Sequence, residues 1–190
     1  VEDVRKYIQK LIHYEKASLD TDYSYLNNLL VSAAFMNPNN TDGHMEEFDI
    51  YKRTHFPEYG KHWYLFDHFN CDCHSLNYDK NYGTELNKEN FLLSLEGEIP
   101  HGFSHIIFHE DHGSDFSFDI SSKSKGHMVT KKDIFVLEDS THDNIIFTVS
   151  CNTANFSEDC IGENFLRRNT IAFVGCTDVG WRPEYSFLNV

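Results

Sequence analysis

The sequence predicts one α/β domain with a mostly parallel sheet and helices on both of its faces. The chain has 190 residues and is 40% hydrophobic, which is enough for one domain with a substantial core. Short apolar runs rich in Ile, Val and Phe alternate with segments of helical periodicity. Strands that are apolar throughout are typical of parallel sheets, because helices bury both faces. Since no repeat or linker interrupts the chain, we expect residues 1–190 to form a single domain.

The first half of the chain alternates helical and strand patterns. Apolar residues at helical spacing predict a first helix, and they are Val4, Tyr7, Ile8, Leu11 and Ile12. The patterns that follow predict a strand over 29–35, a helix over 44–56, a strand over 63–69 and a helix over 85–97. Gly97 stands where a helix commonly ends, and the Pro- and Asn-rich segment after the first strand predicts a loop.

Three more apolar runs follow in the second half, over 104–109, 144–151 and 170–176. Between the last two we expect a helix over 157–168, with Ser157 as its N-cap. In parallel sheets the functional groups gather at the carboxyl ends of the strands. The residues that follow these three runs are "HEDHGS", "CNTANF" and "CTDVGW". If the three strands are neighbours, a histidine, a cysteine and an acid with a tryptophan meet at one edge.

His112 and Cys151 are the main candidate pair at that edge. A thiolate is a nucleophile, and a nearby imidazole both generates and stabilises it. Gly113 follows the histidine directly and allows close approach of the backbone, so its N–H and that of Cys151 could face a developing oxyanion. The alternative from the residues alone is an unconnected histidine at a strand end and a small buried cysteine.

Two long stretches of the sequence resemble the catalytic half of the gingipain-type cysteine peptidases. They are "HIIFHEDHGSDFSF" and "IIFTVSCNTANFSEDCIGENFLRRNTIAFVGCTDVGW". In that C25-like family, part of the larger caspase-like clan, one strand ends in a His-Gly pair and a later strand ends in Cys. The segment "VRKYIQKLIHYEK" is similar to the family's helix with a Tyr-Glu end. The resemblance therefore spans nearly the whole chain, more loosely in the middle, and implies a caspase-like three-layer sandwich.

The resemblance implies a cysteine endopeptidase in which His112 is the general base and Cys151 the nucleophile. The N–H groups of Gly113 and Cys151 would form the oxyanion hole, and water would hydrolyse the thioester acyl-enzyme. His109 is the less favoured base because no glycine follows it. Asp111 stands where the family commonly has Gly, next to the imidazole that it would favour in the protonated form. The competing reading is an inactive peptidase-like domain that serves as a binding or scaffold module.

The resemblance also implies a third catalytic residue and a substrate pocket. The family's acid follows an earlier strand, and the matching turn here contains Asn37, with Glu46 farther along, as the candidates that orient the imidazole. An aromatic wall from the loop after the last strand matches Trp181, and Asp178 lies in the same loop. A carboxylate there would favour cleavage after Arg or Lys, and this preference stays open.

Metal and cofactor signals are weak. The cluster "CDCH" at 71–74 has no second pair at zinc-site spacing, so we expect no metal in the catalytic site. The oxygen-rich segments 37–47 and 138–143 could hold a structural Ca²⁺, but neither has the EF-hand spacing. We expect no required cofactor. Five cysteines, an odd number, argue against a disulfide scaffold.

The charge of the chain limits its partners. The net charge of −14 and the isoelectric point of about 5.1 disfavour nucleic acid and anionic membranes. No apolar run is long enough to span a bilayer, so a protein or peptide substrate is the expected partner. The chain shows neither an initiating Met nor a signal peptide. We expect a fragment of a longer protein, with further domains of the same chain as partners. Because the relatives are secreted or on the cell surface, we expect an extracytoplasmic location.

Overall fold

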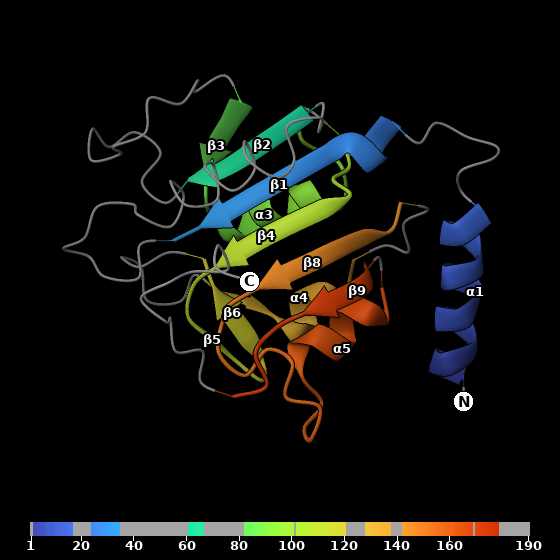
Figure 1. Ribbon diagram of the computed structural model, residues 1–190. Coiled ribbons are helices and arrows are strands. Elements are labelled where there is room, and N and C mark those ends of the chain that lie inside the picture. The colour runs from blue at the N-terminus through green and yellow to red at the C-terminus, as the bar shows by residue number, and fades with distance from the viewer. Residues whose placement is uncertain are drawn as a thin grey trace, which may run out of the picture.

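A six-stranded, all-parallel sheet forms the centre of the protein (Figure 1). The computed structural model describes residues 2–16, 24–34, 61–66, 82–100, 102–120, 128–137, 142–168 and 170–178. The strands lie in the order β3 (Gly83–Glu85), β2 (Lys61–Phe66), β1 (Asn28–Ala33), β4 (Ile106–Glu110), β8 (Asn144–Thr148) and β9 (Thr170–Val174). A single 3-10 turn, η2 (Ser24–Asn27), leads into β1. The predicted parallel α/β architecture is confirmed.

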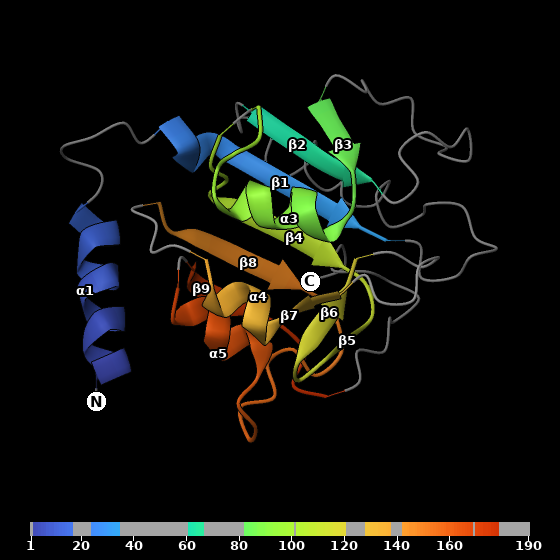
Figure 2. The same cartoon turned by 180° about the vertical axis from the view of Figure 1, so that it is seen from behind.

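Three helices cover one face of this sheet (Figure 2). They are α3 (Lys88–Leu95), α4 (Lys131–Phe135) and α5 (Ile161–Leu166). Their buried side chains, such as Phe91, Ile134 and Phe165, form one cluster with alternate strand residues, including Leu30 and Ile107. Burial of each such side chain contributes about 1.5–3 kcal/mol, which makes this layer the main core.

The other face of the sheet is also buried. A second cluster includes Leu29, Val31, Tyr64 and Ile106, with Phe108 and Phe147 packed against it. All six positions of β1 are buried, which explains why its apolar residues do not alternate with exposed ones; its two polar residues, Asn28 and Ser32, are buried as well. Neither face of the central strand could tolerate a charge without a large loss of stability.

A small antiparallel sheet follows β4 directly. It consists of β5 (Gly113–Ser114), β6 (Ser117–Asp119) and β7 (Met128–Thr130). Phe118, at the centre of β6, is fully buried and contacts Phe91 and Phe165, with ring centroids 5.3 and 5.7 Å away. Phe118, together with the fully buried Val129 of β7, attaches the small sheet to the main core and holds the hairpin after β4 in place.

The first helix, α1 (Glu2–Lys16), packs through polar side chains. The Tyr7 hydroxyl donates to the carbonyl of Ile171 at 2.8 Å. The Lys10 ammonium group lies 2.6–2.8 Å from three carbonyl oxygens, those of Leu166, Arg168 and Thr170. The helical periodicity that predicted α1 is confirmed, but its apolar residues Val4, Ile8 and Ile12 are exposed in the structure. A cation at the carbonyl end of α5 is favourable for that helix.

Several element boundaries differ from the predictions. The helix α5 begins at Ile161 with Cys160 as its N-cap, so the prediction of Ser157 as N-cap is wrong. The Ser157 hydroxyl instead donates to the Asn155 side chain at 2.6 Å. Gly97 follows α3 with a φ of +75°, as its position predicted. The predicted helix 44–56 lies outside the described residues. Within those residues, no helix has the length and hydropathy that crossing a bilayer would need.

Candidate active site

The carboxyl ends of β4, β8 and β9 lie side by side and form one edge of the sheet. His112 follows β4, Cys151 follows β8 and Asp178 follows β9. The backbone N–H of Val149 donates to the carbonyl of His109 at 3.4 Å, so the pairing continues beyond the strands. The His112 side chain is exposed, and Cys151 is a half-buried free thiol. We refer to this edge, residues 111–113, 149–154 and 175–178, as the rim.

Gly113 lies directly against the turn that contains Cys151. A β-carbon at Gly113 would lie 2.7 Å from Cβ of Ser150 and 2.9 Å from the backbone oxygen of Cys151. It would also lie 3.0 Å from Cγ2 of Thr153. Because only glycine fits at this distance, the structure brings the His-Gly pair and the cysteine turn into contact, as the positions of the strands predicted.

Hydrogen bonds between neighbouring residues stabilise the turn that contains Cys151. The Ser150 N–H donates to the Thr148 hydroxyl at 3.1 Å, and the Thr153 hydroxyl donates to the carbonyl of Ser150 at 2.9 Å. Asn152 adopts a left-handed conformation with a φ of 56°, which asparagine tolerates better than most residues. The chain therefore reverses sharply at Cys151 and Asn152.

The loop after β9 fixes the other side of the turn. The N–H of Asn152 donates to the carbonyl of Asp178 at 3.0 Å, and that of Ala154 donates to the carbonyl of Cys176 at 2.9 Å. The Cys176 thiol donates to the carbonyl of Val149 at 3.4 Å. Burial, with a smaller effect of the nearby Cys151, raises the pKa of Cys176. Two thiols thus share the rim, and Cys176 is the one whose surroundings disfavour the thiolate.

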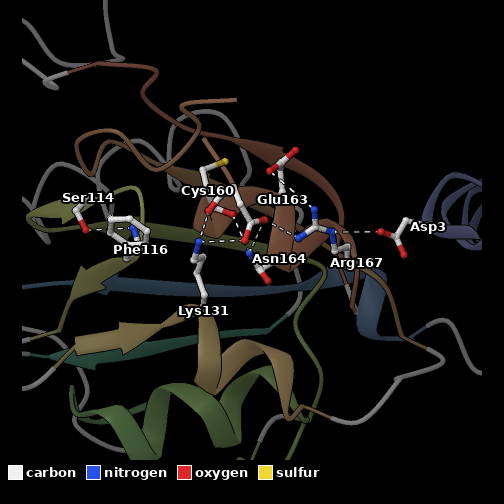
Figure 3. A network of polar contacts seen from close by, with 9 residues as sticks. Asp3, Ser114, Phe116, Lys131, Cys160, Glu163, Asn164 and Arg167 are labelled. Atoms are coloured by element: carbon white, nitrogen blue, oxygen red, sulfur yellow. Dashed lines mark hydrogen bonds and ion pairs between the residues drawn. The ribbon is translucent and has the colours of Figure 1, made fainter. Parts of the chain in front are cut away.

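An ion-pair network joins α4, the segment before α5, the end of α5 and α1 (Figure 3). The Asp159 carboxylate binds Arg167 at 2.7 Å and Lys131 at 3.0 Å, and these bonds lower the pKa of Asp159. Arg167 also lies 3.6 Å from Asp3 of α1. At the tip of the hairpin, the backbone oxygen of Asp115 accepts from the N–H of Ile161 at 2.8 Å. The hairpin that follows His112 is therefore tied to the segment that follows Cys151.

A protein-family model that matches almost the whole chain identifies its family. The model of peptidase family C25 matches residues 1–189. The chain belongs to peptidase family C25. This is the gingipain-type family of cysteine endopeptidases, so the resemblance carried by the His-Gly and Cys motifs is confirmed.

Comparison with solved structures agrees on the fold. A structure described as "Structure of Protease" superposes with a TM-score of 0.66 at 18% sequence identity. The superposition covers 95% of this C25 chain and 35% of that chain. The present chain thus spans about a third of the length of that protein. No curated protein matches the sequence.

The second histidine of the motif, His109, is a core residue in this C25 domain. Its side chain is fully buried, and its Nδ1 lies 3.0 Å from the Ser32 hydroxyl. The ring packs against Phe91 and Phe118, with centroids 5.5 and 4.4 Å away. Burial lowers the pKa of His109 to about 3, so this ring is neutral at physiological pH and has no access to substrate. The preference for His112 over His109 agrees with this position.

The burial of His109 predicts how the stability of the protein changes in acid. Its pKa of about 3 in the fold lies below the ordinary 6.5, so the unfolded chain binds more protons as the pH falls below 6.5. This residue then lowers the free energy of unfolding by about 1.4 kcal/mol per pH unit. We expect His109→Gln to lose less stability than the wild type between about pH 6 and pH 4, measured by urea unfolding.

The matched control for that experiment is Asp143, whose effect on stability changes with pH in the opposite direction. Burial raises the pKa of Asp143 to about 6, above the ordinary 3.8, so the folded state binds more protons in this range. Its contribution is present at low pH and is lost as the pH rises through 6. Asp143→Asn should therefore steepen the acid loss of stability. If the free energy of unfolding falls equally with pH in the wild type and in His109→Gln, the lowered pKa of His109 is contradicted.

Asp111 contacts the backbone of the loop that contains His112. Its side chain is buried, and one carboxylate oxygen accepts from the N–H of His112 at 2.6 Å. This bond holds the loop at the point where β4 ends. The acid therefore orients the His112 backbone, which the sequence alone did not indicate.

The other predicted site residues have different outcomes. The backbone of Asp178 joins the rim, and its side chain is exposed. Asn37, Glu46 and Trp181 lie outside the described residues. So do the cluster 71–74 and most of the two oxygen-rich segments. Within the part of the chain that the structure describes, no group of three His, Cys, Asp or Glu could hold a metal ion.

The sequence patterns did not indicate one carboxylate that lies near His112. Asp119 lies on β6, and its N–H donates to the carbonyl of His112 at 2.8 Å. The signal was the spacing: a two-residue turn at Asp115 and Phe116 pairs position 112 with position 119. The strands are too short to show the alternation from which such a hairpin is usually predicted.

Proposed function

We propose that this chain is the catalytic part of a cysteine endopeptidase in which Cys151 is the nucleophile and His112 the general base. The observation that supports this most is the contact between Gly113 and the Ser150–Cys151 turn. It joins a histidine and a half-buried free thiol from the ends of neighbouring strands. Membership of family C25 supports the same reaction class.

The proposed reaction uses the groups of the rim in turn. His112 takes the proton of Cys151, and the thiolate attacks the carbonyl carbon of the scissile peptide bond. The N–H groups of Gly113 and Cys151 donate to the oxyanion as it forms. The amine leaves with a proton from His112, and a thioester remains on Cys151. Water, activated by the same imidazole, then hydrolyses the thioester and restores the thiol.

The substrate is a peptide or protein. Asp178 is our candidate for recognising a basic side chain before the cleaved bond, since it is the exposed acid of the loop beside the cysteine turn. Trp181 is proposed as the aromatic wall of the same pocket. A location outside the cytoplasm and further domains of a longer chain are proposed from the family, and a structural Ca²⁺ stays a prediction.

Thiol labelling combined with cleavage tests the proposal. The protein is treated with iodoacetamide at neutral pH, and the modified cysteines are mapped by mass spectrometry. Cys151 should react at least about tenfold faster than Cys176, whose pKa is raised, and Cys160 is buried. His112→Ala should remove the advantage of Cys151.

Cleavage is measured on a peptide series that differs only in the residue before the scissile bond. We expect turnover that requires Cys151, and Asp178→Asn should reduce it selectively for Arg and Lys peptides. Equal labelling of Cys151 and Cys176 with no cleavage of any peptide would instead identify an inactive binding or scaffold domain.

A further inference from the structure

Asp119 lies directly opposite His112 across the hairpin that follows β4. The register pairs Ser114 with Ser117 and Gly113 with Phe118. The 2.8 Å bond from the N–H of Asp119 to the carbonyl of His112 continues this register by one pair. Side chains of directly opposed residues in an antiparallel pair lie on the same face, with Cβ atoms about 5 Å apart. The side chain of Asp119 is therefore placed on the same face of the hairpin as the His112 imidazole.

The electrostatics of Asp119 agree with this placement. Burial raises the pKa of this half-buried carboxyl group, and the charge of His112 acts in the opposite direction. Among the described residues, no side chain donates a hydrogen bond to the Asp119 carboxylate. Its neighbour in register on β7 is Met128, which offers no positive charge. His112 is thus the described side chain with which this carboxylate interacts.

The hairpin that contains Asp119 is anchored to the core by the residue before it. The adjacent Phe118 points into the core, where its ring lies 4.4 Å from that of the buried His109. Because successive side chains of a strand point to opposite faces, a buried Phe118 directs Asp119 towards the rim. Because the backbone of Asp119 is already fixed, its carboxylate loses little further conformational entropy when it orients an imidazole.

We propose that Asp119 is the positioning residue for His112, which orients the imidazole and stabilises the imidazolium that forms when Cys151 loses its proton. This inference rests on the proposed function. Asp119 stays ionised throughout and takes no proton, as in other acid–histidine pairs. It would fill the role for which Asn37 and Glu46 were the candidates from the sequence. The other titratable groups near the pair are Asp111, bonded to the His112 backbone, the buried His109, which lies against the backbone of Asp119, and the Cys151 thiol.

The first test measures the imidazole itself and needs no activity. The pKa of His112 is followed by NMR, with the signal assigned from its loss in His112→Gln. Asp119→Asn should lower this pKa by about one unit, because a nearby anion favours the charged ring. Glu158→Gln removes the same charge from an exposed loop residue and should leave the titration unchanged. An unchanged titration in Asp119→Asn would overturn the inference whether or not the protein cleaves peptides.

The second test measures the pH profile of cleavage. Asp119→Asn should lower kcat on the order of 10²-fold with little change in KM, and it should move the acid limb, where protonation of the general base stops the reaction, to lower pH. Asp119→Glu should restore part of the rate, and unchanged thermal unfolding would exclude a loss of structure. If the profile moves in Asn37→Ala or Glu46→Gln but not in Asp119→Asn, the assignment is wrong. A wild type that cleaves through Cys151 would leave the proposed function intact in that case.

Discussion

Cys151→Ala, His112→Ala and the double variant are expected to lose the same activity, on the order of 10⁶ in kcat. In the proposed mechanism the two side chains act as a unit, because the thiolate is the attacking species and the imidazole generates it. Once one of them is absent, the other has no reaction to assist. The loss in the double variant should therefore equal the loss in either single variant and should not be their product.

The measurement is kcat on the best peptide of the series, with thermal unfolding of each variant. Cys176→Ser is the matched control, since it removes the other thiol of the rim and should retain most of the activity. Losses that multiply in the double variant would mean that the two residues act independently. That result would contradict a Cys–His pair even if each single variant were impaired.

Gly113→Ala is expected to lower kcat by about 10²- to 10³-fold. The new methyl group would lie 2.7 Å from Cβ of Ser150 and 2.9 Å from the backbone oxygen of Cys151. A backbone atom cannot move aside as the end of a long side chain can, so His112 and the proposed oxyanion N–H groups must shift. We also expect a loss of about 1–3 kcal/mol in the free energy of unfolding from the overpacking.

Gly102→Ala separates the two effects. Gly102 has a φ of +79°, but a β-carbon there would meet no atom within 4 Å. Its replacement should therefore cost about 1–3 kcal/mol of stability through backbone strain and leave kcat unchanged. If Gly113→Ala keeps full kcat, the close approach of the two loops has no catalytic role.

The sequence was most informative where burial is complete. Five strands of the main sheet could be predicted because each contains a run of buried apolar residues. The sixth, β3, was not predicted, since it has only three residues and none of them is fully buried. His112 and Cys151 could be located because each follows such a run. Asp119 could not be located in this way, since the strands of its hairpin have only two and three residues. Its pairing with His112 depends on a turn geometry that many sequences satisfy.

Two other differences have separate physical causes. The amphipathic pattern of α1 predicted a helix, but periodicity does not say what the helix packs against. In the structure Lys10 and Tyr7 attach it through backbone carbonyls. Ser157 was a reasonable cap by residue type, but its hydroxyl is engaged by the adjacent Asn155, and the chain first turns helical at Ile161. Hydrogen bonds to distant carbonyls decided the first case, and a local hydrogen bond decided the second.

The bonds from Asn152 to Asp178 and from Ala154 to Cys176 have a consequence for the order in which the protein matures. During synthesis, His112 leaves the ribosome well before Cys151, and the loop that supports the cysteine turn leaves later still. Parallel pairing between distant segments forms slowly, so the proposed nucleophile is placed only when β8 and β9 have joined the sheet. Under the proposed function, a nascent chain would therefore be unable to cut itself, or its neighbours on the polysome, until it is folded.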